Sequence, residues 1–229
     1  QIRNPKSPMG VGRIAGKEGT MVVGVTGGIA SGKTTVCRVF EEHGAKVVDA
    51  DRIGRAVVEE DSGILEALRT EFGADMLTGE GTLDRRKMGK RVFADPEAKA
   101  KLEHIVHPPI FLRLREEIRG ALSEDQERPV VVDAALIVEC GIANWFDVVV
   151  MVRTSQESRI ARLMRRNGLS RKEALDRIRS QISDAEKAKA AAFVIGNDGD
   201  EDQLRRRALE VWREINATSE KKRLTEGPF

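Results

Sequence analysis

Short apolar runs alternate with longer amphipathic stretches along most of the chain. Each run has the length of a β-strand and ends at a polar or glycine-marked turn, and the stretches between the runs have helical spacing. Unbroken apolar runs are typical of parallel strands buried on both faces of a sheet. The pattern therefore predicts an α/β fold with a five-stranded parallel sheet and helices on both faces. The predicted strands are 22–26, 46–49, 130–133, 148–152 and 193–195.

One interval between predicted strands is too long for a single crossover helix. About eighty residues separate the second strand from the third, and α/β connections usually need far fewer. Helical patterns around 62–73, 84–93 and 107–121 fill this interval, so we expect a helical insertion over about 52–128 that binds a phosphate acceptor. The basic stretch 155–190 is expected to form a helical lid. The predicted core consists of residues 21–51, 129–154 and 191–216.

Capping boxes mark three predicted helix starts in the second half of the chain. In this pattern a Ser or Thr precedes the helix, and a Glu three residues later returns a hydrogen bond to its backbone. We expect a helix to begin just after each cap. The predicted pairs are Thr154 with Glu157, Ser170 with Glu173 and Ser183 with Glu186.

The two ends of the sequence lack a sustained apolar period. Residues 1–20 are rich in Gly, Pro and Lys. We expect a disordered extension, an expression remnant or sequence upstream of an alternative start at Met21. Residues 217–229 are expected to form a frayed tail.

A glycine-rich segment follows the first predicted strand and opens a predicted helix. Gly27, Gly32, Lys33 and Thr34 match the phosphate-binding motif G-x-x-x-x-G-K-[ST]. Glycines let consecutive N–H groups face a phosphate, the lysine neutralises the β- and γ-phosphates, and the hydroxyl ligates Mg²⁺. An ordinary glycine turn is the alternative, which the strand, lysine and threonine together disfavour. The predicted ATP-binding residues of this P-loop are Gly27, Gly28, Ile29, Ala30, Ser31, Gly32, Lys33, Thr34 and Thr35.

Composition limits the partners of the protein. The chain has 229 residues, of which 40% are hydrophobic, enough for a sizeable core. Its 39 Lys and Arg nearly balance its 37 Asp and Glu, so no long-range field attracts nucleic acid. Cys37 and Cys140 are too few for a disulfide framework, and no apolar run has membrane-spanning length. We expect a cytoplasmic protein, with a monomer favoured, that uses small-molecule substrates and neither nucleic acid nor membrane.

Two carboxylates follow the second predicted strand, close to the expected phosphate site. Asp49 and Asp51 lie two residues apart, so on an extended chain both point to the same side of the sheet at its C-terminal edge. We expect Asp51 to orient and deprotonate an attacking hydroxyl, and Asp49, with Thr34, to organise Mg²⁺. The alternative is that both are solvated strand-end and helix-cap residues. Asp133, at the end of the third predicted strand, is a weaker metal candidate.

Motifs of other P-loop classes are absent from the sequence. It contains no [NT]-K-x-D element for reading guanine and no L-S-G-G-Q-like transporter signature, and its "DRIG" at 51–54 follows the second strand too closely for a GTPase D-x-x-G. A small-molecule kinase is therefore favoured. A non-catalytic ATP-binding switch is the alternative from another class.

Eight motifs follow one another along the chain. They are "GVTGGIASGKTT", "VVDADRIGRAVV", "GTLDRRKMGKRVF", "HIVHPPI", "ALIVECG", "RIARLMRRNGLS", "RIRSQISDAEK" and "FVIGNDG". On these motifs, the chain from Met21 to about Trp212 resembles the dephospho-CoA kinase family. The resemblance implies a P-loop kinase fold with core, acceptor and lid regions. It also implies transfer of the ATP γ-phosphate to the ribose 3′-hydroxyl of dephospho-CoA, with Mg²⁺, in the last step of coenzyme A biosynthesis.

The resemblance implies roles for residues on the acceptor side. Asp51 matches the family's aspartate beside the acceptor hydroxyl. Asp84 and Arg85 match its "LDR" element, and His107 matches its "HP" element, both in the acceptor-binding region. From the sequence alone, His107 is also suited to capping a helix before its proline pair.

On the nucleotide side, Arg162 matches the family's lid arginine, whose guanidinium compensates charge on the transferring phosphoryl group. Asn197 matches an asparagine near the adenine of ATP. The implied catalytic residues are thus Asp51, Lys33 and Arg162. Without the resemblance, Arg162 would be assigned to the solvated face of an arginine-rich helix.

Three positions depart from the family pattern. Ala135 replaces a proline, an exchange expected to loosen the loop after the third strand. Ala192 and Gly196 replace acidic residues near the expected adenine loop. These changes concern local packing and the adenine loop, and the catalytic set is intact. Separately, another small-molecule kinase, for a nucleoside or nucleotide, is an alternative function.

Overall fold

The computed structural model describes residues 12–14 and 20–225, with side chains as far as residue 218. The chain divides into two compact units. The first, called the sheet unit, contains the described residues up to Asp49 and from Ile118 onward. The second, called the helical unit, is Ala50–Glu117, which is shorter than the predicted insertion over 52–128.

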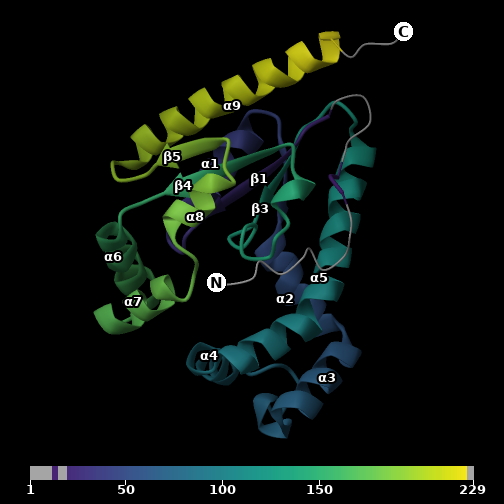
Figure 1. The fold of residues 1–229 in the computed structure, drawn as a ribbon, viewed down its shortest axis with the longest axis vertical. Coiled ribbons are helices and arrows are strands. Elements are labelled where there is room, and N and C mark those ends of the chain that lie inside the picture. The colour runs from purple at the N-terminus through teal and green to yellow at the C-terminus, as the bar shows by residue number, and fades with distance from the viewer. Residues whose placement is uncertain (1–11, 15–19, 226–229) are drawn as a thin grey trace. The chain divides into compact units, whose positions relative to one another are not determined.

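The sheet unit contains a five-stranded parallel sheet with the order β2-β3-β1-β4-β5 (Figure 1). This confirms the predicted fold class. Strand β1 is buried at all six positions, as expected for a strand covered on both faces. Two strands have the predicted bounds, and the other three are one residue longer. The strands are β1 (Val22–Gly27), β2 (Lys46–Asp49), β3 (Val130–Asp133), β4 (Val148–Arg153) and β5 (Phe193–Gly196).

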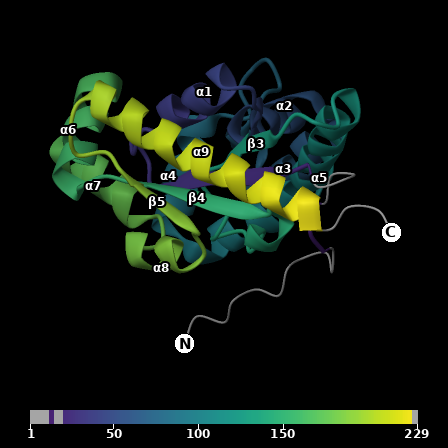
Figure 2. The same ribbon diagram turned by 90° about the horizontal axis from the view of Figure 1, so that it is seen from above.

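Helices α1 and α9 pack together in the main core of the sheet unit. Val23 and Val25 of β1 belong to this core, where the rings of Phe40 and Trp212 stack with their centroids 4.7 Å apart. Figure 2 shows α9 running across the sheet. Helix α8 packs against β1 and β4. The helices are α1 (Lys33–Glu42), α6 (Gln156–Asn167), α7 (Arg171–Arg179), α8 (Asp184–Lys189), α9 (Glu201–Thr225) and the short 3₁₀ helix η3 (Ala143–Trp145).

Two of the three predicted capping boxes are confirmed. Ser170 caps α7 and Ser183 caps α8, each with the reciprocal bond from the Glu three residues later. The third prediction is wrong, because the N-cap of α6 is Ser155. Thr154 is buried, and its hydroxyl lies within hydrogen-bond distance of two backbone carbonyls of the sheet unit, so it is not available as a cap.

The helical unit has a small core of its own, formed by Val58, Ile64, Leu68 and Met88. Two of its predicted helices are confirmed to within one residue at each end. The third, predicted over 107–121, is wrong at its start, because α5 begins at Pro96 and continues through a proline pair. Apolar residues of α5 on both sides of that pair pack on this core, which stabilises the helix despite the lost N–H donors. The helices are α2 (Ala50–Glu60), α3 (Ser62–Phe72), η2 (Ala74–Met76), α4 (Arg85–Ala94) and α5 (Pro96–Glu124), whose last residues belong to the sheet unit.

The chain ends differ from their predictions where they are described. Ile14 is buried, and its N–H donates to the Trp145 carbonyl at 3.0 Å, so the expectation of disorder is wrong at this residue. The rest of that expectation, over 1–11 and 15–19, lies outside the described residues. Helix α9 continues to Thr225, which corrects the predicted frayed tail for 217–225; residues 226–229 are outside the described part.

Candidate nucleotide-binding site

The glycine-rich loop lies between β1 and α1, the position that its motif requires. Gly32 directly precedes α1 with φ 99° and ψ 19°, a left-handed conformation. A Cβ on Gly32 would lie 2.2 Å from Nδ2 of Asn197, so both the backbone angle and the space require glycine. Among the described residues no side chain caps α1, and its first N–H groups are therefore available to an anion.

Lys33, Thr34 and Asp133 are positioned at the carboxyl edge of the sheet. Nζ of Lys33 is 3.4 Å from the carbonyl oxygen of Gly27, and Oγ1 of Thr34 is 3.5 Å from Oδ2 of Asp133. Asp133 ends β3 and is in register with Asp49, which ends the neighbouring strand β2. Both predicted metal carboxylates thus lie at one edge of the sheet, and the proximity to Thr34 favours Asp133 more than its sequence position did.

Cys37 lies beneath this cluster in the core formed by α1 and the sheet. Burial raises the pKa of its thiol well above the usual value, and the negative charge of Asp133 raises it further. The thiol is therefore protonated and hydrogen-bonds to the Asp133 carboxylate. The side chain thus packs the P-loop helix against the sheet.

The oxygen donors near Lys33 fit the coordination that Mg²⁺ prefers. In the described part of the chain, no cluster of three His, Cys, Asp or Glu side chains could hold a metal ion. Mg²⁺ does not require such a cluster, because it keeps several waters and binds one or two protein oxygens together with substrate phosphates. The Thr34 hydroxyl and the Asp133 carboxylate are donors of this kind.

Three consecutive carbonyl groups of the loop are held by side chains from other elements. The donors come from the end of β4, from α6 and from the turn after β5. Because carbonyl oxygens repel phosphate, fixing their direction also fixes which loop groups an anion meets. The contacts are Arg159 Nε to Ile29 O at 3.1 Å, Arg162 Nη1 to Ala30 O at 3.2 Å, Asn197 Nδ2 to Ser31 O at 2.7 Å and Thr154 Oγ1 to Ser31 O at 2.9 Å.

Arg162 and Asn197, both predicted from the sequence, lie together at this loop. Nη2 of Arg162 is 3.0 Å from the backbone carbonyl oxygen of Asn197 and 3.3 Å from its side-chain oxygen. The alternative of a solvated face is therefore wrong for Arg162. Asn197 is buried, and its amide group supports Ser31. Its contact with adenine stays a prediction.

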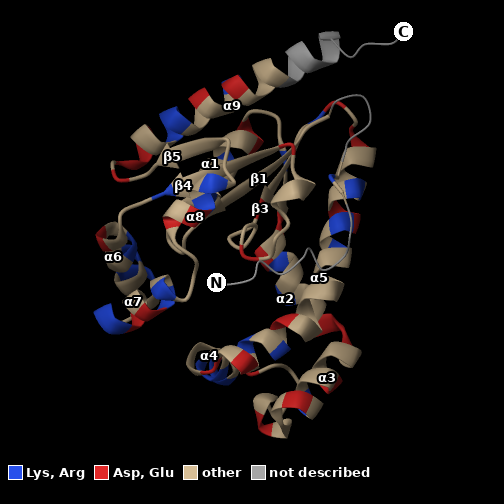
Figure 3. Ribbon diagram, in the orientation of Figure 1, with Lys and Arg blue, Asp and Glu red and all other residues tan. Residues whose placement is uncertain are grey.

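Arg159 and Thr154 are loop contacts that sequence analysis missed. Arg159 is buried, although it belongs to a helix whose arginines suggested a solvated surface. Thr154 was assigned to a cap, but its place just after β4 brings it to the same sheet edge as the loop. Helices α6 and α7 also carry more Lys and Arg than Asp and Glu (Figure 3), which favours anions nearby.

Asp51 belongs to the helical unit and is exposed. It is the second residue of α2, because the chain leaves the extended conformation at Ala50. The prediction that Asp49 and Asp51 point to the same side is therefore wrong in its reason, since only Asp49 is on a strand. The role of Asp51 toward an acceptor stays a prediction.

The other three residues predicted to bind the acceptor, Asp84, Arg85 and His107, have different surroundings. Asp84 is the N-cap of α4 and accepts from two backbone N–H groups at 3.1 and 2.9 Å. Arg85 forms an exposed ion pair with Glu59 at 3.0 Å. His107 lies within α5, so the capping alternative is wrong, and its ring is 5.1 Å from that of Phe111. Burial lowers the pKa of His107, which favours the neutral ring at pH 7.

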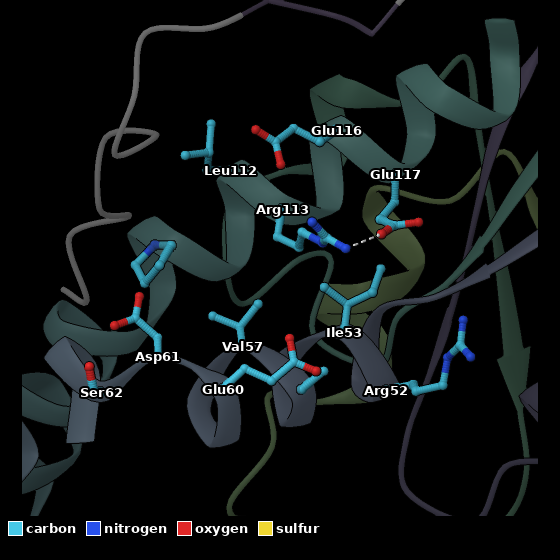
Figure 4. Close-up of a pocket in the computed structure, with 12 residues that line it drawn as sticks. Arg52, Ile53, Val57, Glu60, Asp61, Ser62, Leu112, Arg113, Glu116 and Glu117 are labelled. Carbon is cyan, nitrogen blue, oxygen red and sulfur yellow. Dashed lines mark ion pairs between the residues drawn. The ribbon is translucent and has the colours of Figure 1, made fainter.

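A groove of about 700 Å³ lies between α2 and α5 of the helical unit (Figure 4). Its lining does not include Asp51, Asp84, Arg85 or His107. Acidic residues outnumber basic ones there, so the groove lacks the positive charge that a phosphate-rich ligand needs. The charged lining residues are Arg52, Arg113, Glu60, Asp61, Glu116 and Glu117, with Arg113 and Glu117 paired at 3.0 Å.

Hydrogen bonds hold the loop after β3, although Ala135 stands where the resemblance led us to expect a proline. The carbonyl oxygen of Ala135 accepts from the Thr26 hydroxyl at 3.1 Å and from Nζ of Lys187 at 2.8 Å. Lys187 is fully buried and also lies 2.6 Å from the carboxylate of Glu139. The expected loosening at Ala135 is thus countered by direct bonds to its carbonyl.

None of the described helices combines the length and the apolar character that a bilayer crossing needs.

Sequence comparisons match the chain to one protein family. A sequence model of the dephospho-CoA kinase family matches residues 21–222. A dephospho-CoA kinase of Corynebacterium diphtheriae is 40% identical over 192 residues, covering 84% of this chain and 96% of its own. One from Geobacillus kaustophilus is 38% identical, covering 86% and 98%.

Two solved structures resemble the chain in both sequence and fold. A protein from Thermus thermophilus is 34% identical with a TM-score of 0.70, covering 84% of this chain and 95% of its own. A dephospho-CoA kinase from Campylobacter jejuni is 29% identical with a TM-score of 0.56, covering 86% and 98%.

Proposed function

The chain belongs to the dephospho-CoA kinase family, and on this basis we propose that it transfers the γ-phosphate of ATP to the ribose 3′-hydroxyl of dephospho-CoA. The products are coenzyme A and ADP. Family membership confirms the resemblance predicted from the sequence and makes the protein an ATP-dependent kinase. The observation that carries the proposal is the loop between β1 and α1, whose carbonyls are held while the α1 N-terminus remains open to an anion.

On the nucleotide side, the P-loop (residues 27–35) binds the triphosphate, mainly through the N–H groups at the start of α1. Lys33 places its ammonium against the β- and γ-phosphates, where negative charge increases during transfer. Arg162 adds a second positive group from α6. Its hydrogen bonds to the carbonyls of Ala30 and Asn197 hold the guanidinium next to the loop. Together these groups lower the barrier mainly by positioning and charge stabilisation.

Thr34 and Asp133 would hold Mg²⁺, with Asp49 at the end of the neighbouring strand as a further oxygen donor. When bound, Mg²⁺ neutralises charge on the β- and γ-phosphate oxygens. The hydrogen bond from the Cys37 thiol keeps the Asp133 carboxylate oriented without adding charge.

The residues proposed to bind the acceptor belong to the helical unit. Asp51 orients the acceptor hydroxyl and takes its proton, while Asp84, Arg85 and His107 bind dephospho-CoA. Residues 155–190 act as a lid that excludes water from the transfer. A cytoplasmic location is proposed from the small number of cysteines and the metabolic role.

A coupled assay of ADP release, with and without dephospho-CoA, tests this proposal. We expect ADP release to depend on dephospho-CoA, and phosphorus NMR to assign the new phosphate to the 3′-oxygen. Nucleosides and nucleotides serve as comparison acceptors. Turnover of a nucleoside but not of dephospho-CoA would replace the proposed acceptor, whereas ATP binding without any acceptor-dependent ADP release would leave a nucleotide-dependent switch.

A further inference from the structure

At the tip of the P-loop, the backbone N–H and the carbonyl group of Ile29 are both hydrogen-bonded to side chains of other elements. The N–H of Ile29 donates to Oε1 of Gln181 at 2.8 Å, and its carbonyl oxygen accepts from Nε of Arg159 at 3.1 Å. Arg159 belongs to α6, and Gln181 lies in the turn between α7 and α8. The region predicted to be a lid is therefore bonded directly to the loop.

Arg159 is itself fixed by a third residue. Its side chain is only 6% exposed and forms an ion pair with Asp184, the first residue of α8, at 3.2 Å. A buried guanidinium is costly unless it is paired and hydrogen-bonded. The contacts with Asp184 and Ile29 meet that requirement, so the position of Arg159 is well determined.

Gly28 provides independent support for a built contact. The phosphate-binding motif requires no glycine at this position, and the structure gives no left-handed φ there. A Cβ on Gly28 would lie 2.4 Å from Cζ of Arg159, so any side chain would displace the guanidinium. The glycine is therefore explained by Arg159 rather than by the phosphate.

We propose that Arg159 and Gln181 are positioning residues that fix both polar groups of Ile29 inside the protein, so that the N–H groups of the residues that follow, and not the loop carbonyls, face the triphosphate. The buried guanidinium directs the Ile29 carbonyl into the protein, as Arg162 and Asn197 do for the next two carbonyls. This proposal rests on the proposed function, because it assigns the loop to ATP. It also predicts that movements of α6–α8 change the affinity for ATP.

The test uses two substitutions with matched controls in the full chain. Arg159→Lys keeps the charge but loses the fork that joins Ile29 to Asp184, and Gln181→Met keeps the length but loses the acceptor. The controls are Arg165→Lys on the exposed face of α6 and Gln156→Met at its exposed start. ATP dissociation constants are measured by calorimetry without acceptor, followed by kcat and both KM values.

We expect Arg159→Lys and Gln181→Met to raise the ATP dissociation constant about tenfold and about threefold, the range for loss of one structural hydrogen bond. The KM for the acceptor should not change, and the controls should match wild type. Gln181→Met should also accelerate hydrogen exchange of the Ile29 amide. If Arg159→Lys does not fold, Gln181→Met decides alone.

Values within twofold of wild type in Gln181→Met, or equal changes of both KM values, would overturn the proposal. Its failure is distinct from failure of the proposed function. A wild-type protein that binds ATP but does not phosphorylate dephospho-CoA disproves only the acceptor, whereas an active wild type with an unaffected Gln181→Met variant disproves only the positioning role.

Discussion

In the sheet unit several residues around the P-loop carbonyls make buried or partly buried hydrogen bonds, whereas the candidate residues of the helical unit lie at a helix end, on exposed pairs or in partly buried positions. Of the buried polar and charged side chains in the described residues, all except Arg115 belong to the sheet unit. Several of these, including Ser31, Thr154, Arg159 and Asn197, belong to the P-loop or contact it.

The difference shows which unit holds its candidate residues in fixed positions. Buried polar groups are stable only when their hydrogen bonds are made, so the loop has little freedom to rearrange. Arg85 and Glu59, with side chains 46% and 53% exposed, form a pair of the kind that contributes little to stability. The P-loop of the sheet unit is therefore preorganised, whereas the candidate residues of the helical unit are less constrained.

Lys33→Ala should have the largest effect, because it removes the ammonium group that we propose to contact the β- and γ-phosphates. We expect kcat/KM to fall by more than about 10⁴, through both weaker ATP binding and slower transfer. Lys46→Ala, which removes an exposed lysine paired with Glu124 in the same unit, is the control and should remain active. Steady-state kinetics with ATP and dephospho-CoA measure both, and a Lys33→Ala enzyme with near-normal kcat would exclude the loop from the mechanism.

Asp51→Asn tests the acceptor side at its most important position. The change keeps a hydrogen-bonding group and removes the base, so we expect a fall in kcat on the order of 10²–10⁴ with nearly unchanged ATP affinity. Asp61→Asn, at the N-cap of α3, retains its capping function and serves as the control. Calorimetry with ATP and rates of 3′-phosphorylation separate the two effects, and a kcat within tenfold of wild type would refute the role of Asp51.

The fold was predictable because its information is local. Strand bounds were correct to within one residue since unbroken apolar runs end at polar turns, and the P-loop motif lies in one short segment. Arg159 could not be selected among the arginines of α6, because only the folded chain brings it to Gly28 and Ile29. Asp51 was misplaced on an extended chain because nothing in "VVDAD" marks the turn into α2.

Asp84 allows substrate binding and helix capping to be separated. Asp84→Ala removes the cap of α4 and should lower the free energy of unfolding by about 1 kcal/mol. Asp84→Asn preserves the cap, so it should retain stability while raising the KM for dephospho-CoA if the carboxylate contacts the acceptor. Urea unfolding and acceptor kinetics on both variants provide the measurement. Normal kinetics in Asp84→Asn would leave Asp84 with a structural role alone.

Gly54→Ala should produce the smallest effect, and a favourable one. Gly54 lies inside α2, where alanine is better than glycine by about 0.5–1 kcal/mol. Its new Cβ would meet Cδ1 of Ile110 at 3.5 Å, an ordinary contact within the helical unit. Gly120→Ala in α5, where nothing lies within 4 Å of the added Cβ, isolates the helix propensity from this contact.

Urea unfolding of the two variants should show a gain for each, with any excess in Gly54→Ala due to Ile110. The opposite sign is expected for Gly32→Ala in the sheet unit, where φ is positive and Asn197 occupies the space. The same substitution thus measures how closely each unit is packed around its glycines. A loss of stability in Gly54→Ala would mean that the helical unit is as tightly constrained at this glycine as the P-loop is at Gly32, and would remove the contrast between the two units.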